Sequence, residues 1–203
     1  MRLNPTAMSG EVGVSGSEWS RAERKFRSAP DRVPDVTTGC GWIGGVAMSI
    51  QQRLEDAQFL YENGRREGAL LSVLIAVAAT ARRRYPRPIK DQDAFQRFVG
   101  EEMQTITRAA TGGTGSVRNI NVNYLGRMLP LQKVLYKYVR CELAHEAGLP
   151  ESVEFDPAPG FRISVSEDKV VLSDGFIVGL SQAVIHAREN SDLFGAEVSP
   201  DGP

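Results

Sequence analysis

The segment LYKYVRCELAHEAGLP, residues 135–150, holds an arginine and a histidine, Arg140 and His145, with four residues between them. Histidine is the side chain that titrates near neutral pH, so a neutral His145 could accept the proton of a ribose 2′-hydroxyl as a general base. The guanidinium group of Arg140 is a fork of donors that matches phosphate oxygens and could stabilise the charge that builds on them. Together the two residues could cleave RNA without a metal, leaving a 2′,3′-cyclic phosphate.

The spacing of this pair has a consequence for its geometry. Residues five apart on an α-helix are separated by about 140°, so Arg140 and His145 do not share one stripe of a helix. Cys141 and His145, four apart, do share one. A two-fold copy of the helix would bring both pairs into one groove, so we expect a homodimer. Cys141 and Glu142 are the supporting residues, and Glu142 or Glu146 would either orient an imidazole or face water.

A purely structural interpretation of the same residues stays open. Arg140 could hold a carboxylate in an ion pair, because buried and half-buried arginines commonly do so. His145 could be a polar residue at the C-terminal end of a helix, where the helix dipole favours a cation. This interpretation needs no catalysis.

Apolar periodicity predicts the helices that must position these residues. Ser49 is suited to cap the first helix, Asn63-Gly64 to end it, and Pro130 to stand in the first turn of the helix that carries Arg140. The predicted helices span residues 50–63, 66–84, 92–109, 130–147 and 174–189. Alternating residues around Glu167-Asp168 predict a hairpin of Phe161–Val165 and Lys169–Leu172. The fold is therefore predicted to be all-α, an up-down helical bundle with a small β-hairpin before the last helix.

The ends of the chain differ from its middle. Residues 1–47 are rich in Gly, Ser, Pro and Thr and lack a sustained apolar period, so we expect a disordered or loosely structured extension. An independent start at Met48 would leave this extension without function. Residues 48–192 are the predicted helical domain, and residues 193–203 a flexible tail.

The composition is that expected of a cytoplasmic protein. The largely apolar run from Ala69 to Ala81 has 13 residues, which is too short to span a bilayer, so no membrane partner is expected. The two cysteines of the chain do not form a disulfide framework and suit a reducing compartment. The N-terminus lacks the continuous apolar segment of a secretory signal.

Charge is distributed unevenly along the chain. The 203 residues carry a net charge of −1. Residues 82–140 hold twelve Lys and Arg against four acids, and residues 141–203 hold three Lys and Arg against twelve acids. Such asymmetry can mark a nucleic-acid surface, and Arg82, Arg83, Arg84 and Lys137 are the residues we expect to grip RNA phosphates. Alternatively, the two segments neutralise each other by packing together.

Neither a metal nor a cofactor is expected. Two histidines and two cysteines at these spacings supply no cluster of three or four zinc ligands. The glycines of TGGTGS, residues 111–116, lack the lysine of a phosphate-binding loop, so this stretch is interpreted as a linker. His186, in the last predicted helix, is interpreted as a half-buried or surface residue.

The order of these segments resembles the HEPN superfamily of helical-bundle RNases and toxins. The likeness lies in a first helix ending in YENG, the apolar helix ALLSVLIAVAATARRRYP, and Arg-x4-His within VRCELAHEAGLP. It implies a HEPN-like bundle and a metal-independent endoribonuclease in a toxin or antiviral role, with Arg140 and His145 as the catalytic pair. The implied partners are RNA, a second copy of the chain and a cognate antitoxin protein. Cys141 stands where the family commonly has Asn, Asp or His, and an inactive dimeric binding or adaptor protein is the alternative.

Overall fold

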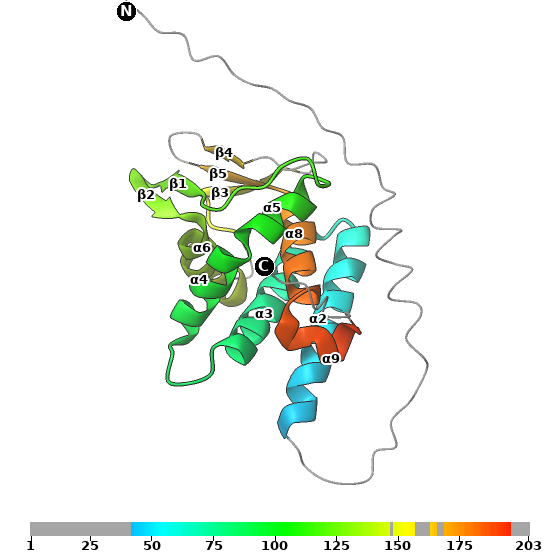
Figure 1. Ribbon diagram of the computed structural model, residues 1–203. Helices are drawn as coiled ribbons and strands as arrows, with labels where there is room; N and C mark the ends of the chain where they lie inside the picture. The colour runs from blue at the N-terminus through cyan, green and yellow to red at the C-terminus, as the bar shows by residue number, and fades with distance from the viewer. Residues whose placement is uncertain (1–41, 147, 157–162, 166–168, 196–203) are drawn as a thin grey trace, which may run out of the picture.

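The computed structural model describes residues 42–146, 148–156, 163–165 and 169–195, with side chains from Ile50 onward except in 163–165. Helices form most of this part of the chain, and two small sheets lie at one end of them (Figure 1). The prediction of a mostly helical protein with a small hairpin is therefore confirmed. Most of the predicted N-terminal extension, and the tail beyond Gly195, lie outside the described residues.

The first two helices pack side by side. Helix α2 (Trp42–Glu62) begins earlier than predicted and takes in residues 42–47, which the sequence assigns to the extension. It ends at Asn63-Gly64 as predicted, and Gly64 has a φ of 72°, a left-handed conformation that glycine adopts without steric cost. Helix α3 (Arg66–Arg84) then follows within the predicted bounds.

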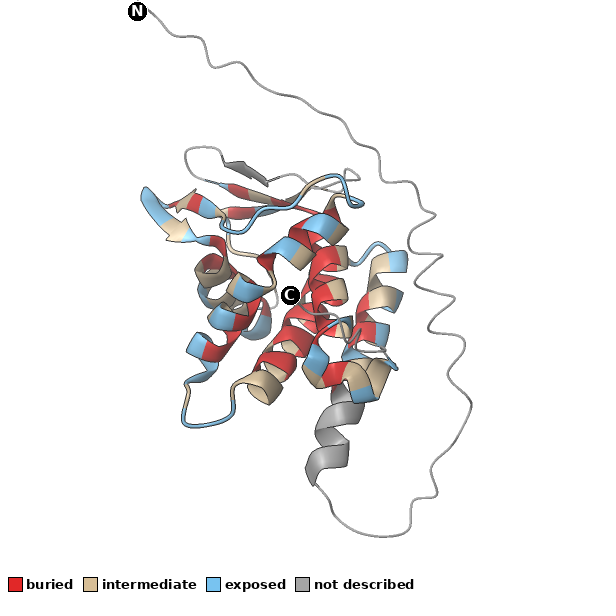
Figure 2. Cartoon of the chain, viewed as in Figure 1, coloured by how far each residue is buried: buried red, intermediate tan, exposed pale blue. Residues whose placement is uncertain are grey.

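Helix α3 is the centre of the core, as its nearly uninterrupted apolar sequence predicts. It contacts α2, α4 and α8, and the sides of these helices that face one another are buried (Figure 2). Full burial of a Val or Leu side chain contributes roughly 1.5–3 kcal/mol relative to exposure. The fully buried apolar residues of this helix are Ala69, Leu70, Val73, Leu74, Ala76, Val77 and Ala81.

The helix predicted over residues 92–109 is two helices, α4 (Asp91–Glu101) and α5 (Met103–Ala110). The break is at Glu102, whose φ of −85° and ψ of 4° lie outside the α region. Its carboxylate is held 2.8 Å from Nη2 of Arg84 in α3, a partner distant in sequence that no local pattern could reveal. The large apolar residues that recur at helical spacing in these two helices are buried, namely Phe95, Phe98, Val99, Met103 and Ile106.

An unpredicted hairpin precedes the segment that carries Arg140. Strands β1 (Asn121–Tyr124) and β2 (Arg127–Pro130) pair antiparallel. Both residues of the turn between them, Leu125 and Gly126, have positive φ, which matches the twist that two-residue hairpins require. The predicted helix over 130–147 follows as α6 (Leu131–Val134), the π-helical turn η1 (Leu135–Arg140) and α7 (Cys141–His145). Pro130 ends β2 and stands just before the helix, not in its first turn.

The predicted hairpin belongs to a three-stranded sheet in the order β3-β5-β4. Strands β4 (Ile163–Val165) and β5 (Val170–Ser173) pair antiparallel, which confirms the predicted pairing of these residues. Residues 161 and 162, also expected in the first strand, lie outside the described part of the chain. Strand β3 (Val153–Asp156) adds to β5 in parallel and was not predicted.

The last helix is shorter than predicted and is followed by two single turns, namely α8 (Gly175–Ile185), η2 (Arg188–Asn190) and α9 (Ser191–Phe194). Asp174, where the predicted helix begins, stands directly before α8, and its carboxylate does not cap the helix. Both of its oxygens instead lie 2.9 Å from Nε of Arg66, which ties α8 to the start of α3. Burial raises the pKa of Asp174 above its ordinary range, and the hydrogen bond from Arg66 opposes that shift.

At one point the backbones of helices α5 and α8 approach each other closely, with no side chain between them. A Cβ added at Gly179 in α8 would stand 2.3 Å from the carbonyl oxygen of Ile106 in α5, a separation that real Cβ atoms do not show. Only glycine therefore permits this approach. None of the helices in the described part of the chain combines the length and the apolar composition needed to cross a bilayer.

Candidate functional site

The helical segment from Leu131 to His145 keeps one apolar row toward the core through its π-helical turn. Residues four apart on an α-helix drift by about 40° per step, since each turn holds 3.6 residues. The wider i→i+5 turn of η1 winds more slowly and offsets this drift. The four apolar residues at every fourth position are therefore all almost completely buried, namely Leu131, Leu135, Val139 and Leu143.

The same spacing arranges the polar residues in rows. Gln132, Tyr136 and Arg140 form the row beside the apolar one, and Tyr136 meets Phe95 of α4 with ring centroids 5.2 Å apart. The row opposite the apolar one is more exposed and consists of Lys133, Lys137, Cys141 and His145. Arg140 and His145 thus diverge on one chain, as their five-residue spacing predicts.

His145 is the last residue of α7 and is exposed to solvent. No hydrogen bond or ion pair joins its imidazole to any residue that the structure describes. Both ring nitrogens are therefore open to a ligand from outside the chain. His186, the other histidine, is also exposed, but its Nε2 lies 3.1 Å from the side-chain oxygen of Gln182 in α8.

Arg140 is half-buried and lacks an acidic partner among the described residues. Its guanidinium carbon lies 5.3 Å from the ring centroid of Tyr136, and its Nε is buried without a hydrogen-bond acceptor. The expectation that Arg140 holds a carboxylate in an ion pair therefore finds no support among these residues. A buried donor left without an acceptor costs roughly 1–3 kcal/mol.

The supporting residues lie around this pair. Cys141 is a half-buried free thiol in the row of His145, and Glu142 is half-buried in α7. Lys137 is exposed, and its Nζ lies 5.2 Å from the ring centroid of Tyr138. That ring stacks on Tyr124 of β1 with centroids 4.3 Å apart, so the hairpin and η1 share one aromatic contact.

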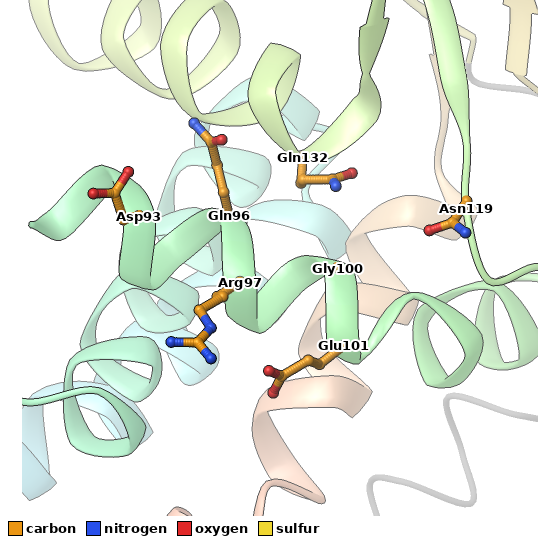
Figure 3. Close-up of a pocket in the computed structure, with 7 residues that line it drawn as sticks. All are labelled: Asp93, Gln96, Arg97, Gly100, Glu101, Asn119 and Gln132. Atoms are coloured by element: carbon orange, nitrogen blue, oxygen red, sulfur yellow. The ribbon is translucent and has the colours of Figure 1, made fainter. Parts of the chain in front are cut away.

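An open pocket lies beside this segment, between α4, the loop before β1 and the start of α6 (Figure 3). Neither Arg140 nor His145 lines it. Gln132, which lies in the same row of the helix as Arg140, is one of the residues that line the pocket. The residues of the pocket come from three separate stretches of sequence, so no local pattern indicated it.

Arg82, Arg83 and Arg84 at the end of α3 each form an ion pair within the fold. Arg82 pairs with Asp91, and Arg83 lies 2.9 Å from both oxygens of Asp192. Because each guanidinium already has an acidic partner, the geometry gives no support to the prediction that these arginines bind RNA phosphates. Arg83 and Arg84 neutralise acids of residues 141–203, as the alternative interpretation of the charge pattern expects, whereas Arg82 pairs with an acid of its own segment.

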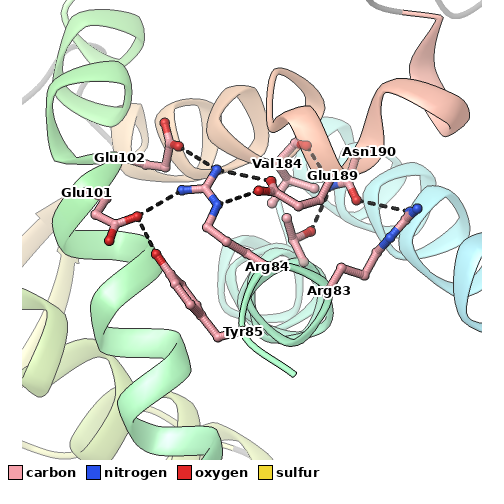
Figure 4. A network of polar contacts seen from close by, with 9 residues as sticks. Arg83, Arg84, Tyr85, Glu101, Glu102, Val184, Glu189 and Asn190 are labelled. Atoms are coloured by element: carbon pink, nitrogen blue, oxygen red, sulfur yellow. Dashed lines mark hydrogen bonds and ion pairs between the residues drawn. The ribbon is translucent and has the colours of Figure 1, made fainter. Parts of the chain in front are cut away.

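Arg84 is the most heavily bound of the three. Its side chain is 16% exposed and contacts the carboxylates of Glu101, Glu102 and Glu189 at 3.3, 2.8 and 2.8 Å (Figure 4). Burial alone would raise the pKa of Glu189, but the hydrogen bond and charge of Arg84, a backbone hydrogen bond and the charge of Arg188 together hold that pKa below its ordinary value. Burial and the hydrogen bond to Glu101 raise the pKa of Tyr85. The network fastens α4, α5 and η2 to α3.

The described residues include no group of three or more His, Cys, Asp and Glu side chains that could hold a metal ion. In a comparison with known families, residues 49–198 match a family model described as Rv1289. This range contains the whole segment from Leu131 to His145. The description states no activity. No curated protein and no solved structure matches the chain.

Proposed function

The chain belongs to the Rv1289 family, and we propose that it is a HEPN-like, metal-independent endoribonuclease that acts as a homodimer. The main support for this proposal is that Arg140 has no acidic partner. Among the described residues five arginines are half-buried, and Arg66, Arg82, Arg83 and Arg84 each have an acidic partner within the fold. Arg140 alone of the five has none. No described carboxylate neutralises its guanidinium, which suits an anion from outside, and the phosphate of RNA is such an anion.

The proposed reaction uses the two residues in different roles. His145 accepts the proton of a ribose 2′-hydroxyl, and the freed oxygen attacks the adjacent phosphorus. The bond from phosphorus to the 5′-oxygen breaks, and that oxygen leaves with the proton from an imidazolium. The products are a 2′,3′-cyclic phosphate and a free 5′-hydroxyl. Arg140 stabilises the charge that develops on the phosphoryl oxygens.

The homodimer is part of this proposal because the two residues diverge on one chain. Arg140 lies in the row that meets α4, whereas His145 lies in the row opposite the core. A two-fold copy of α7 would bring the arginine of one chain toward the histidine of the other. Two cations of the same row, half-buried Lys133 and exposed Lys137, would then border the groove and attract RNA.

A catalytically inactive dimeric adaptor is the second candidate. The partial burial of Arg140 against Tyr136 favours it, because a guanidinium held in this way stabilises a surface without reaching a scissile phosphate. The two candidates agree on the dimer and differ only in chemistry. A test for RNA cleavage therefore distinguishes the two candidates.

The experiment that tests the proposal is incubation of the purified protein with total RNA in EDTA. Wild-type protein should leave fragments with 2′,3′-cyclic phosphate ends. His145→Ala and Arg140→Lys should abolish cleavage, while the matched control His186→Ala should cleave as wild type does. Wild-type protein that leaves total RNA intact would contradict the nuclease and favour the adaptor. Equal activity in His145→Ala and His186→Ala would remove His145 from the mechanism.

A further inference from the structure

The tip of the first hairpin, residues 125–128, exposes apolar side chains to solvent. Leu125 is 61% exposed and Met128 is 68% exposed, and both lie at the turn that joins β1 to β2 (Figure 2). Met128 pairs with Asn123, on the face of the hairpin that points away from buried Val122 and Tyr124. An antiparallel hairpin with one solvated face usually carries polar residues on that face, so Met128 departs from the pattern.

The backbone at Leu125 provides a second observation. Leu125 has a φ of 49°, a left-handed conformation that glycine and asparagine adopt at low cost and leucine does not. Two-residue turns between such strands usually carry Asn-Gly for this reason. Leu125 is also not among the residues that pack against the core. A leucine at this position therefore lowers the stability of the fold, and its side chain is available to a partner outside the chain.

The segment that contains the hairpin is cationic. Residues 103–141 include six Lys and Arg and neither Asp nor Glu. Arg127 in the tip and Arg118 in the loop before β1 are both exposed, and neither forms an ion pair with a described carboxylate. Because each strand has only four residues, an anionic surface that receives the tip also attracts the cations at the base of the hairpin.

An apolar tip in a cationic segment favours one class of partner. A second copy of the chain would present the same cations, which repel one another, and its open pocket between α4 and α6 is lined by polar and charged side chains that do not suit a leucine. RNA would attract Arg127 but would offer Leu125 and Met128 no apolar surroundings. The exposed residues of the tip also include no aromatic ring on which a base could stack. An anionic bilayer offers both environments, because its charged headgroups lie directly above hydrocarbon.

We propose that the hairpin tip docks on the surface of an anionic lipid bilayer. Leu125 and Met128 enter the boundary between headgroups and acyl chains, and Arg127, between them in sequence, contacts the anionic headgroups. Docking of this kind needs no segment that spans the bilayer, and none of the described helices is such a segment. Two aliphatic side chains give weak and reversible binding, as a single acyl chain does.

The experiment measures cosedimentation of the full chain with lipid vesicles in the absence of RNA. The protein should bind vesicles of phosphatidylcholine mixed with phosphatidylserine. It should bind vesicles of phosphatidylcholine alone about tenfold more weakly, because the arginines then lose their anionic partners. Added NaCl should release the protein from the mixed vesicles, since salt screens these contacts.

Three variants locate the contact on the hairpin. Leu125→Asn removes the apolar side chain and suits the left-handed backbone, so vesicle binding should fall by about tenfold or more while the unfolding midpoint stays equal or rises. Met128→Gln keeps the length of the side chain and should weaken binding by a similar factor of about ten. Phe59→Gln is the matched control, because Phe59 is 65% exposed on α2, and it should bind as wild type does.

The outcomes separate the bilayer from other partners. Wild-type protein that does not sediment with the mixed vesicles overturns the proposal, as does undiminished binding of Leu125→Asn and Met128→Gln. An equal loss in Phe59→Gln overturns it too, because binding would then not depend on the hairpin. Tip variants that keep vesicle binding but dissociate a dimer in sedimentation velocity, or lose affinity for RNA, assign the tip to a second copy or to RNA instead. The vesicle assay contains no RNA, so its result does not depend on the nuclease proposed above.

Discussion

Arg140 lies against the ring of Tyr136, with 5.3 Å from guanidinium carbon to ring centroid, and its buried Nε finds no acceptor in the described part of the chain. The contact with the ring supports the positive charge, but it does not satisfy the N–H group. Arg140 is therefore held in place at a cost to stability. Residues kept in this state are more often retained for binding or catalysis than for folding.

The first prediction concerns the stability cost of Arg140. Arg140→Met removes a buried donor and keeps the apolar stem, so the free energy of unfolding should stay within about 1 kcal/mol of wild type or rise. Arg66→Met is the matched control, because it deprives buried Asp174 of its partner and should cost about 1–3 kcal/mol. Urea denaturation of both variants makes the comparison. A larger loss for Arg140→Met than for Arg66→Met would return Arg140 to a structural role.

The second prediction concerns the ion-pair network around Arg84. Arg84→Ala leaves three carboxylates without their shared cation, two of them less than one quarter exposed, and should lower the free energy of unfolding by about 3–5 kcal/mol. Arg108→Ala, at an exposed arginine of α5 with no ion pair in the described residues, should change it by no more than about 0.5 kcal/mol. Thermal unfolding should show this difference, and equal midpoints would mean that the network contributes nothing.

The third prediction concerns acid. Because the pKa of Glu189 is lowered in the folded protein, its contribution to stability is complete above the ordinary value of 4.5 and is lost as pH falls through the folded pKa. Glu189→Gln should therefore be less stable than wild type at about pH 7, and the gap should narrow below about pH 4.5. The unfolding midpoint of both proteins, measured from about pH 7 to about pH 3, tests this. A gap that is constant across the range would exclude titration of Glu189 as the cause.

The fourth prediction concerns the contact between α5 and α8. Gly179→Ala forces a Cβ against the backbone carbonyl of Ile106, so the helices must separate, at a cost of about 1–3 kcal/mol. Gly100→Ala, whose Cβ would meet nothing closer than 3.5 Å, should be neutral or stabilise α4 by up to about 1 kcal/mol. Chemical denaturation of the two variants compares the same substitution in two helices. Equal free energies of unfolding for Gly179→Ala and Gly100→Ala would show that α5 and α8 can move apart at little cost.

The parts of the fold that the sequence predicted are those set by local patterns. The bounds of α3 follow from its apolar run and from Asn63-Gly64 before it, and the pairing of β4 with β5 follows from their alternation. The start of α2 was missed because Gly44 and Gly45 suggested a loop. The first hairpin was missed because only its Leu125-Gly126 turn marks it, and leucine rarely adopts the positive φ found there.

The parts that were missed depend on partners distant in sequence. The break at Glu102 and the commitment of Arg84 follow from one contact between α3 and the end of α4, which no local window contains. The row of Gln132, Tyr136 and Arg140 requires the π-helical turn, and a pattern scored at 3.6 residues per turn cannot anticipate it. The divergence of Arg140 and His145 on one chain was predicted, because residues five apart on a regular helix such as α7 are separated by about 140°.

The π-helical turn also makes this segment tolerant of a change in length. Removing a residue from an ordinary α-helix rotates everything after it by about 100° and would turn a buried face toward solvent. A turn closed by i→i+5 bonds holds one residue more than an α-helical turn, so losing exposed Lys137 would allow η1 to continue as α-helix. Helices α6 and α7 would keep their mutual orientation. The chain thus contains, three residues before Arg140, a position where a single-residue deletion preserves the register of the helix.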